Sequence, residues 1–169
     1  MAVLKTKYDT EQTLTCTLAS LASSTTKVAG RSSAAFDNAT TRALDCLLSG
    51  KITTGTSPTV NRTIQIWIYP EVDNGGSPAY PDVFDGTDAN DTVTSENVRN
   101  SALRLAATIN VDSNSNRTYG FGPVSIASLF GGVMPEKWGV WVVHDTGVAL
   151  NSTGSNHALW VRPVWVETV

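Results

Sequence analysis

Two runs decide the fold: Trp138-Gly-Val-Trp-Val-Val-His144 and Ala158-Leu-Trp-Val-Arg-Pro-Val-Trp165-Val166. Both are rich in Val and Trp, which favour strands, and neither shows the period of about 3.6 residues that marks an amphipathic helix. The linker between them is rich in Gly, Asn, Ser and Thr, which are turn-forming residues. This end of the chain is therefore predicted to be a β-hairpin stiffened by large aromatic side chains.

Similar strand-like runs extend towards the N-terminus. They are predicted at residues 12–20, 31–36, 42–54, 63–69, 102–110 and 117–126. In the run 63–69, Ile64, Ile66 and Ile68 alternate with Trp67 and Tyr69, so the isoleucines are predicted to face the core. The run 42–54 places Leu44, Cys46 and Leu48 on one face, and Gly50 indicates a bulge or bend.

These runs amount to about eight strands, and most of the connections are too short to hold a crossover helix. Antiparallel pairing follows, because parallel strands need connections of a dozen or more residues. The predicted fold is all-β, an antiparallel two-sheet sandwich with jelly-roll or Greek-key connections. One long loop is expected at residues 70–95, and a helical turn stopped by glycine is expected at 125–130. The run 95–102 is ambiguous, with a short helical turn as one interpretation. Residues 1–11 are predicted to form an N-terminal arm and residues 12–169 a single β-sandwich domain.

Composition excludes several classes of function. The 169 residues carry a net charge of −3 and a pI near 5.2, and Lys and Arg are scattered, which argues against a nucleic-acid partner. No run approaches the roughly 20 apolar residues needed to span a bilayer, and the first residues lack the apolar core of a signal peptide. We expect synthesis in the cytoplasm, with Cys16 and Cys46 as reduced, buried thiols.

No catalytic constellation is apparent. The only histidines are His144 and His157, and His144 is followed by Asp145. Neighbours on a strand point to opposite faces, so this Asp is not expected to orient this His in a triad. We predict half-exposed histidines at strand ends, no enzymatic activity and no cofactor.

The acidic run 82–91 contains the one metal-like pattern, formed by Asp82, Asp85, Asp88 and Asp91. Carboxylates are the hard oxygen ligands that calcium prefers, but their order does not match an EF-hand loop. Turns in which Asp side chains bond to nearby backbone N–H groups are the preferred interpretation, and a calcium site is the weaker alternative.

Trp67 and Tyr69 raise the question of sugar binding, because they share the face of their run that lies opposite the isoleucines. Two interpretations remain open. The rings form a platform for glycans, or they pack in the core or against another subunit, as large aromatic residues commonly do.

Several segments resemble a family of short structural proteins of tailed bacteriophages. They are Ala29-Gly-Arg-Ser-Ser-Ala-Ala35, Ser49-Gly-Lys-Ile-Thr-Thr-Gly-Thr56, Tyr80-Pro-Asp-Val-Phe-Asp-Gly86, Ser128-Leu-Phe-Gly-Gly132, Trp138-Gly-Val and His144-Asp-Thr-Gly147. The resemblance covers the chain from about residue 10 to its end and is carried by loops and turns. It implies a virion component, specifically a capsid decoration (cement) protein with a jelly-roll-like fold.

The resemblance also implies partners and a location. Such proteins sit on the capsid surface as trimers, so the major capsid protein and further copies of this chain are the expected partners, after synthesis in the host bacterial cytoplasm. We expect Lys5, Lys7 and Tyr8 of the arm to contact the shell or a neighbouring subunit, with a frayed terminus as the alternative. Competing functions are a carbohydrate-binding jelly-roll module for host attachment and a neck, tail or head-fibre structural protein.

Overall fold

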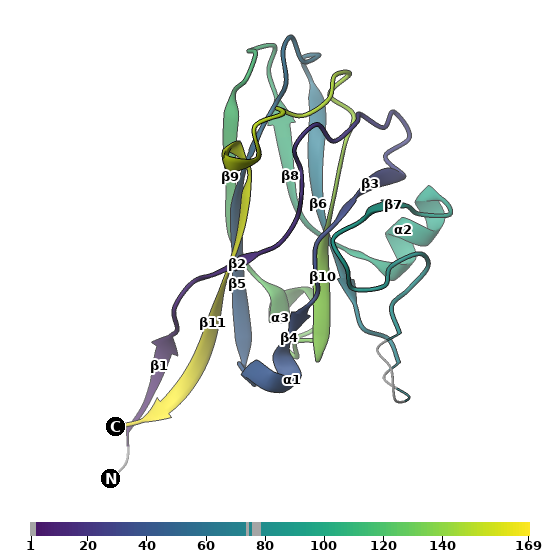
Figure 1. The fold of residues 1–169 in the computed structure, drawn as a ribbon. Coiled ribbons are helices and arrows are strands. Elements are labelled where there is room, and N and C mark those ends of the chain that lie inside the picture. The colour runs from purple at the N-terminus through teal and green to yellow at the C-terminus, as the bar shows by residue number, and fades with distance from the viewer. Residues whose placement is uncertain (1–2, 74, 76–78) are drawn as a thin grey trace.

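The computed structural model describes residues 3–73, 75 and 79–169, which form two antiparallel sheets packed face to face (Figure 1). Sheet A contains β1 (Leu4–Tyr8), β2 (Gln12–Leu14), β5 (Asp45–Thr53), β9 (Thr118–Ser125) and β11 (Ala158–Thr168). Sheet B contains β3 (Ala29–Ser32), β4 (Phe36–Asp37), β6 (Arg62–Pro70), β7 (Asn90–Thr92), β8 (Arg104–Val111) and β10 (Lys137–His144). The predicted fold class, an all-β antiparallel sandwich, is confirmed.

The chain passes repeatedly from one sheet to the other. Sheet A has the order β1-β11-β5-β9, with β2 also paired to β11, and sheet B has the order β7-β3-β10-β6-β8, with β4 also paired to β10. The two C-terminal runs therefore lie in different sheets, β10 in sheet B and β11 in sheet A. The predicted hairpin is wrong, because each of these strands buries its apolar face by pairing with distant strands and packing across the core.

The helices are short and lie at the ends of strands. They are α1 (Asn38–Thr41), α2 (Glu96–Ala102), α3 (Ile126–Leu129) and the 3₁₀ turn η1 (Gly154–Asn156). Ser95 and Ser125 cap α2 and α3 by accepting hydrogen bonds from Val98 N–H and Ser128 N–H. The Gly132 N–H donates to the Ala127 carbonyl at 2.8 Å and closes α3. The helical turn predicted at 125–130 is confirmed, and the ambiguous run 95–102 forms a helix.

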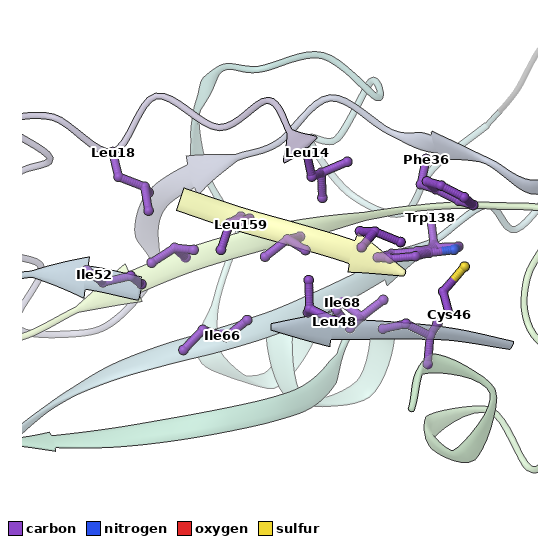
Figure 2. Packing of buried hydrophobic residues seen from close by; sticks show 14 of the residues in the cluster. Leu14, Leu18, Phe36, Cys46, Leu48, Ile52, Ile66, Ile68, Trp138 and Leu159 are labelled. Carbon is purple, nitrogen blue, oxygen red and sulfur yellow. The ribbon is translucent and has the colours of Figure 1, made fainter. Parts of the chain in front are cut away.

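The main core lies between the two sheets (Figure 2). Ile64, Ile66 and Ile68 of β6 are fully buried there, as their alternation predicts. Burying each such side chain contributes about 1.5–3 kcal/mol. Across the core, the pairing of β5 with β9 shifts register between Leu48 and Gly50, so the predicted irregularity at Gly50 is confirmed.

Three details of the strand predictions are wrong. The run 12–20 keeps its alternation of burial, but the strand ends at Leu14 because the chain leaves β11 and crosses to sheet B, where the Thr15 carbonyl accepts from Ala34 N–H. The run 31–36 is split between β3 and β4. Leu44 precedes β5 and is 61% exposed, so it does not share the buried face of Cys46 and Leu48, although its backbone N–H donates to the Val164 carbonyl.

A second, smaller core covers the outer face of sheet B. It contains Trp67, Tyr69, Phe84, Val93, Leu103, Trp141 and Val143. Phe84 and Val93 come from the long segment after β6, which lies with α2 against the outside of this sheet (Figure 1). Part of the predicted loop 70–95 therefore packs on the outer face of sheet B and contains the edge strand β7. We call residues 80–93 the cover.

Candidate functional site

The aromatic pair of β6 lies under this cover. Trp67 is 7% exposed and Tyr69 is fully buried. The Tyr69 ring stacks on Phe84 with ring centroids 4.6 Å apart, and its hydroxyl donates to the Ser33 carbonyl at 2.6 Å. Burial raises the pKa of Tyr69 above its ordinary value. Of the two interpretations of this ring, the structure has packing within the chain, because residues 80–93 occupy its face.

Trp67 is held in the same way. Its Nε1–H donates to Gln65 Oε1 at 3.1 Å, and the Arg99 guanidinium lies 5.1 Å from the ring centroid. Arg99 itself donates to the Lys27 carbonyl at 2.6 Å, so it joins α2 to the segment before β3. A flat ring open to solvent, which a sugar platform needs, is absent at Trp67, because the ring packs in the second core.

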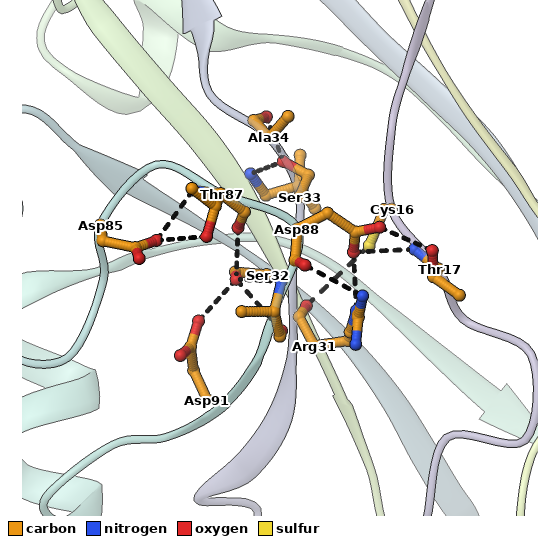
Figure 3. Close-up of polar contacts among 12 residues, drawn as sticks. Cys16, Thr17, Arg31, Ser32, Ser33, Ala34, Asp85, Thr87, Asp88 and Asp91 are labelled. Carbon is orange, nitrogen blue, oxygen red and sulfur yellow. Dashed lines mark hydrogen bonds and ion pairs between the residues drawn. The ribbon is translucent and has the colours of Figure 1, made fainter.

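The aspartates of the acidic run hold this cover in place through hydrogen bonds, and we call the four of them the acidic frame (Figure 3). Asp82 accepts from the N–H and hydroxyl of Thr94 at 2.7 and 2.6 Å. Asp85 accepts from the N–H and hydroxyl of Thr87 at 2.9 and 2.6 Å, and these bonds lower the pKa of Asp85. The Asp85 carboxylate therefore closes a local turn, which is the preferred interpretation of this run, whereas Asp82 binds a residue 12 positions further along the chain.

Asp88 joins three distant segments. Its carboxylate accepts from Arg31 Nε at 2.6 Å and from the N–H and hydroxyl of Thr17 at 3.0 and 2.6 Å. The Arg31 Nη2 also donates to the Asp88 carbonyl at 3.0 Å. Burial by itself would raise the pKa of Asp88, but the hydrogen bonds from Arg31 and Thr17 outweigh it and lower the pKa. Asp88 is an ionised clamp between the cover, β3 and the segment that follows β2.

Asp91 completes the frame at β7. Its Oδ2 accepts from the Ser32 hydroxyl at 2.5 Å, and burial raises the pKa of this carboxyl. The four carboxylates thus bind different partners of the protein. Within residues 3–73, 75 and 79–169, no group of three or more His, Cys, Asp or Glu residues is placed to hold a metal ion.

Both histidines are buried, so the prediction of half-exposed side chains is wrong. His144 is fully buried between Thr146 Oγ1 at 2.9 Å and the Leu21 carbonyl at 3.1 Å. His157 lies 2.8 Å from the Asn151 carbonyl through Nε2 and 3.4 Å from Thr53 N–H through Nδ1. A carbonyl only accepts, so Nε2 carries the proton in each neutral ring. Burial lowers the pKa of both groups.

Asp145 does not orient His144, in agreement with the alternation of the strand. It accepts from Thr63 N–H at 2.8 Å and lies 3.2 Å from Lys27 Nζ and 3.6 Å from Arg62 Nη1. Cys16 and Cys46 are free; Cys46 is buried and Cys16 is half-buried. Burial raises the pKa of both thiols, that of Cys46 to about 12. These groups are placed for packing and hydrogen bonding, and neither thiol is activated as a nucleophile.

The predicted arm forms an exposed surface. Lys5, Lys7 and Tyr8 belong to β1, which is exposed along its whole length and pairs with the end of β11. Lys7 Nζ lies 3.4 Å from Glu167 Oε2 of that strand. We call the two-stranded structure formed by residues 3–9 and 163–169 the ribbon; Figure 1 shows it extending away from the sandwich. The structure separates the ribbon from Trp67 and Tyr69, which lie on the other sheet.

Sequence reasoning missed the partners that hold the acidic frame. Thr17 and Arg31 lie 71 and 57 residues from Asp88, and no local pattern marks them. Phe84 stands inside the acidic run, but its place over Tyr69 depends on how the run folds back.

Comparisons with known proteins assign no family to this arrangement. No family model matches the chain, and no curated protein or solved structure is significantly similar to it. No helix in the described ranges has the length and apolar character needed to cross a membrane.

Proposed function

We propose that this chain is a non-enzymatic structural protein of a tailed-bacteriophage virion, a capsid decoration protein that binds the outside of the assembled head and stabilises it. The observation that carries the proposal is the strand order. Without the extra strands β1 and β7, the sheets read β2-β11-β5-β9 and β3-β10-β6-β8, with β4 continuing β3 along β10. This order supports a jelly roll, the double Greek-key sandwich used by viral capsid proteins and by lectins.

The side chains favour assembly over sugar binding. A fold alone does not assign a function, so the choice between these classes rests on the surface. The lectin-like alternative depended on open rings at Trp67 and Tyr69, and both rings lie under the chain's own cover. Five of the eleven exposed large hydrophobic side chains in the described ranges lie on the ribbon instead, which suits a contact with another protein.

Stabilisation of the head would work by mass action. A protein that binds the assembled shell and not its free subunits stabilises the shell by an amount that grows with the ratio of free concentration to Kd. No bond needs to be made or broken, which is consistent with buried histidines and thiols of raised pKa. The arm residues Lys5, Lys7 and Tyr8 are exposed and available for this contact.

The test is binding to heads. Phage heads produced without this protein are mixed with the purified chain, sedimented, and imaged by electron cryomicroscopy with symmetry imposed and relaxed. We expect co-sedimentation, added density outside the shell at its symmetry axes, and a higher temperature of DNA release. Density only at the neck, tail or fibres would replace the decoration role with one of those structural roles. No binding to any virion part would overturn the proposal.

A further inference from the structure

The ribbon has two chemically different faces. The register pairs Leu4 with Thr168, Thr6 with Val166 and Tyr8 with Val164, so these six side chains share one face. We call it the uncharged face, since none of the six carries a charge. The opposite face contains the charged side chains and the Lys7–Glu167 ion pair; its members are Val3, Lys5, Lys7, Trp165, Glu167 and Val169.

The uncharged face is apolar and uncovered. Leu4 is 71% exposed, Tyr8 is 60% exposed and Val166 is 48% exposed. Five of the eleven exposed large hydrophobic residues in the described ranges belong to the ribbon: Leu4, Tyr8 and Val166 on the uncharged face, and the paired Val3 and Val169 on the opposite face. The other six, which are Leu44, Val60, Val72, Val83, Leu105 and Val133, are distributed over separate segments. The ribbon is therefore the main exposed apolar surface among the described residues.

Contacts of β1 within the chain do not explain how the ribbon is stabilised. β1 contacts β11 and adds no buried residue to either core. An isolated two-stranded ribbon is only marginally stable in water. Trp165, on the charged face, does pack partly against the main core, so the uncharged face is the one turned away from the sandwich.

We infer that the uncharged face is a self-association surface, on which the same face of a second copy of this chain packs as one sheet layer on another. An uncharged, apolar and twisted surface needs a partner of the same character, and the ribbon of a second copy supplies one by symmetry. No charged group is buried without a partner in such a contact, because the lysines and Glu167 lie on the other face.

The free edge of β1 favours packing of one ribbon face on another over pairing of β1 with the β1 strand of a second copy. Val3 and Val169 exchange hydrogen bonds at 3.1 and 2.9 Å, so the alternation directs the backbone groups of Leu4, Thr6 and Tyr8 outwards. Antiparallel pairing of this edge with its own copy, centred on Lys5, Thr6 or Lys7, places a lysine opposite a lysine. Such like-charge pairs are destabilising, and lysines on an edge strand oppose edge-to-edge pairing.

The size of the surface sets the expected strength. Six side chains per copy cover less than the roughly 800 Å² per partner of a standard interface, so association should depend on concentration. The inference concerns the purified chain alone and does not rest on the virion role. Failure to bind heads would leave it intact, and a monomeric chain could still bind a shell.

Sedimentation equilibrium of the full chain over a wide concentration range tests this surface. We expect dimers whose dissociation constant rises at least tenfold in the double variant Leu4→Thr/Tyr8→Thr. The matched control, Leu44→Thr/Val133→Thr, changes two side chains of similar exposure elsewhere, 61% and 76%, and should associate like the wild type. A wild-type chain that is monomeric at all concentrations, or association that the ribbon variant leaves unchanged, would overturn the inference.

Cross-linking gives a readout that does not depend on weakening the ribbon. Val166→Cys places a thiol on the uncharged face, and Glu167→Cys places one on the opposite face. Oxidation should convert Val166→Cys into a covalent dimer at concentrations where Glu167→Cys remains monomeric. Equal yields from the two variants would contradict face packing. Circular dichroism confirms that each variant is folded.

Discussion

At the scale of single residues, Gly139 decides whether Tyr69 can take its place. The two residues are opposite each other in the pairing of β10 with β6, and a Cβ built at Gly139 would overlap the Tyr69 ring. Gly139→Ala should therefore force the ring off Phe84 and cost about 1–3 kcal/mol of unfolding free energy, the usual range for overpacking. Urea titration followed by Trp fluorescence measures the change. Gly154→Ala, where no atom lies within 4 Å of the added Cβ, is the control and should be far milder.

His157 gives a second prediction at this scale, about pH. Its Nδ1 accepts from Thr53 N–H, so protonation of the ring removes that bond. Burial lowers its pKa in the folded state, so the unfolded chain binds the proton more readily. The stabilisation by the neutral ring is complete above the unfolded pKa of about 6.5 and is lost as pH falls through the lowered folded value.

Thermal unfolding between pH 7.5 and 5 measures this effect. The wild type should become less stable as pH falls through this range, and His157→Gln should show a shallower slope. His144 contributes in the same direction because burial lowers its pKa as well, so the double variant His157→Gln/His144→Gln should be flatter still. Parallel slopes in all three proteins would show that neither ring is the source.

At the scale of elements, the cover on sheet B depends on the Asp88 clamp. Asp88 is 16% exposed in its side chain and joins the cover to β3 and to Thr17. Asp88→Asn keeps the shape but leaves Arg31 without its charged partner, which should cost roughly 1–3 kcal/mol. Hydrogen exchange should rise first in β7 and residues 82–94. Glu11→Gln, which removes the exposed Arg162–Glu11 pair, should have little effect, and equal exchange in both variants would contradict the clamp.

The same elements show how far the sequence predicts this fold. Alternation located β6 and the core isoleucines, and the glycines at 131 and 132 located the helical turn before them, because these patterns are local. It could not place β10 and β11 in different sheets, since pairing depends on residues far along the chain. The outward aromatic residues of β6 look the same in sequence whether solvent, a partner or residues 80–93 cover them. The acidic run predicted the local turn of Asp85. It did not indicate the partners of Asp82 and Asp88, which lie 12, 57 and 71 residues away along the chain.

At the scale of the whole molecule, the sandwich and the ribbon should be separable. Both buried clusters consist of residues from 14 onwards, and β1 contacts β11 at a place where every β1 side chain is exposed. A chain that begins at Thr10 should therefore fold with nearly the same urea midpoint and the same near-ultraviolet Trp spectrum. It should also lose self-association, because half of the uncharged face is gone. A large drop in the midpoint would mean that the ribbon supports the sandwich, and would assign β1 a role in folding in place of assembly.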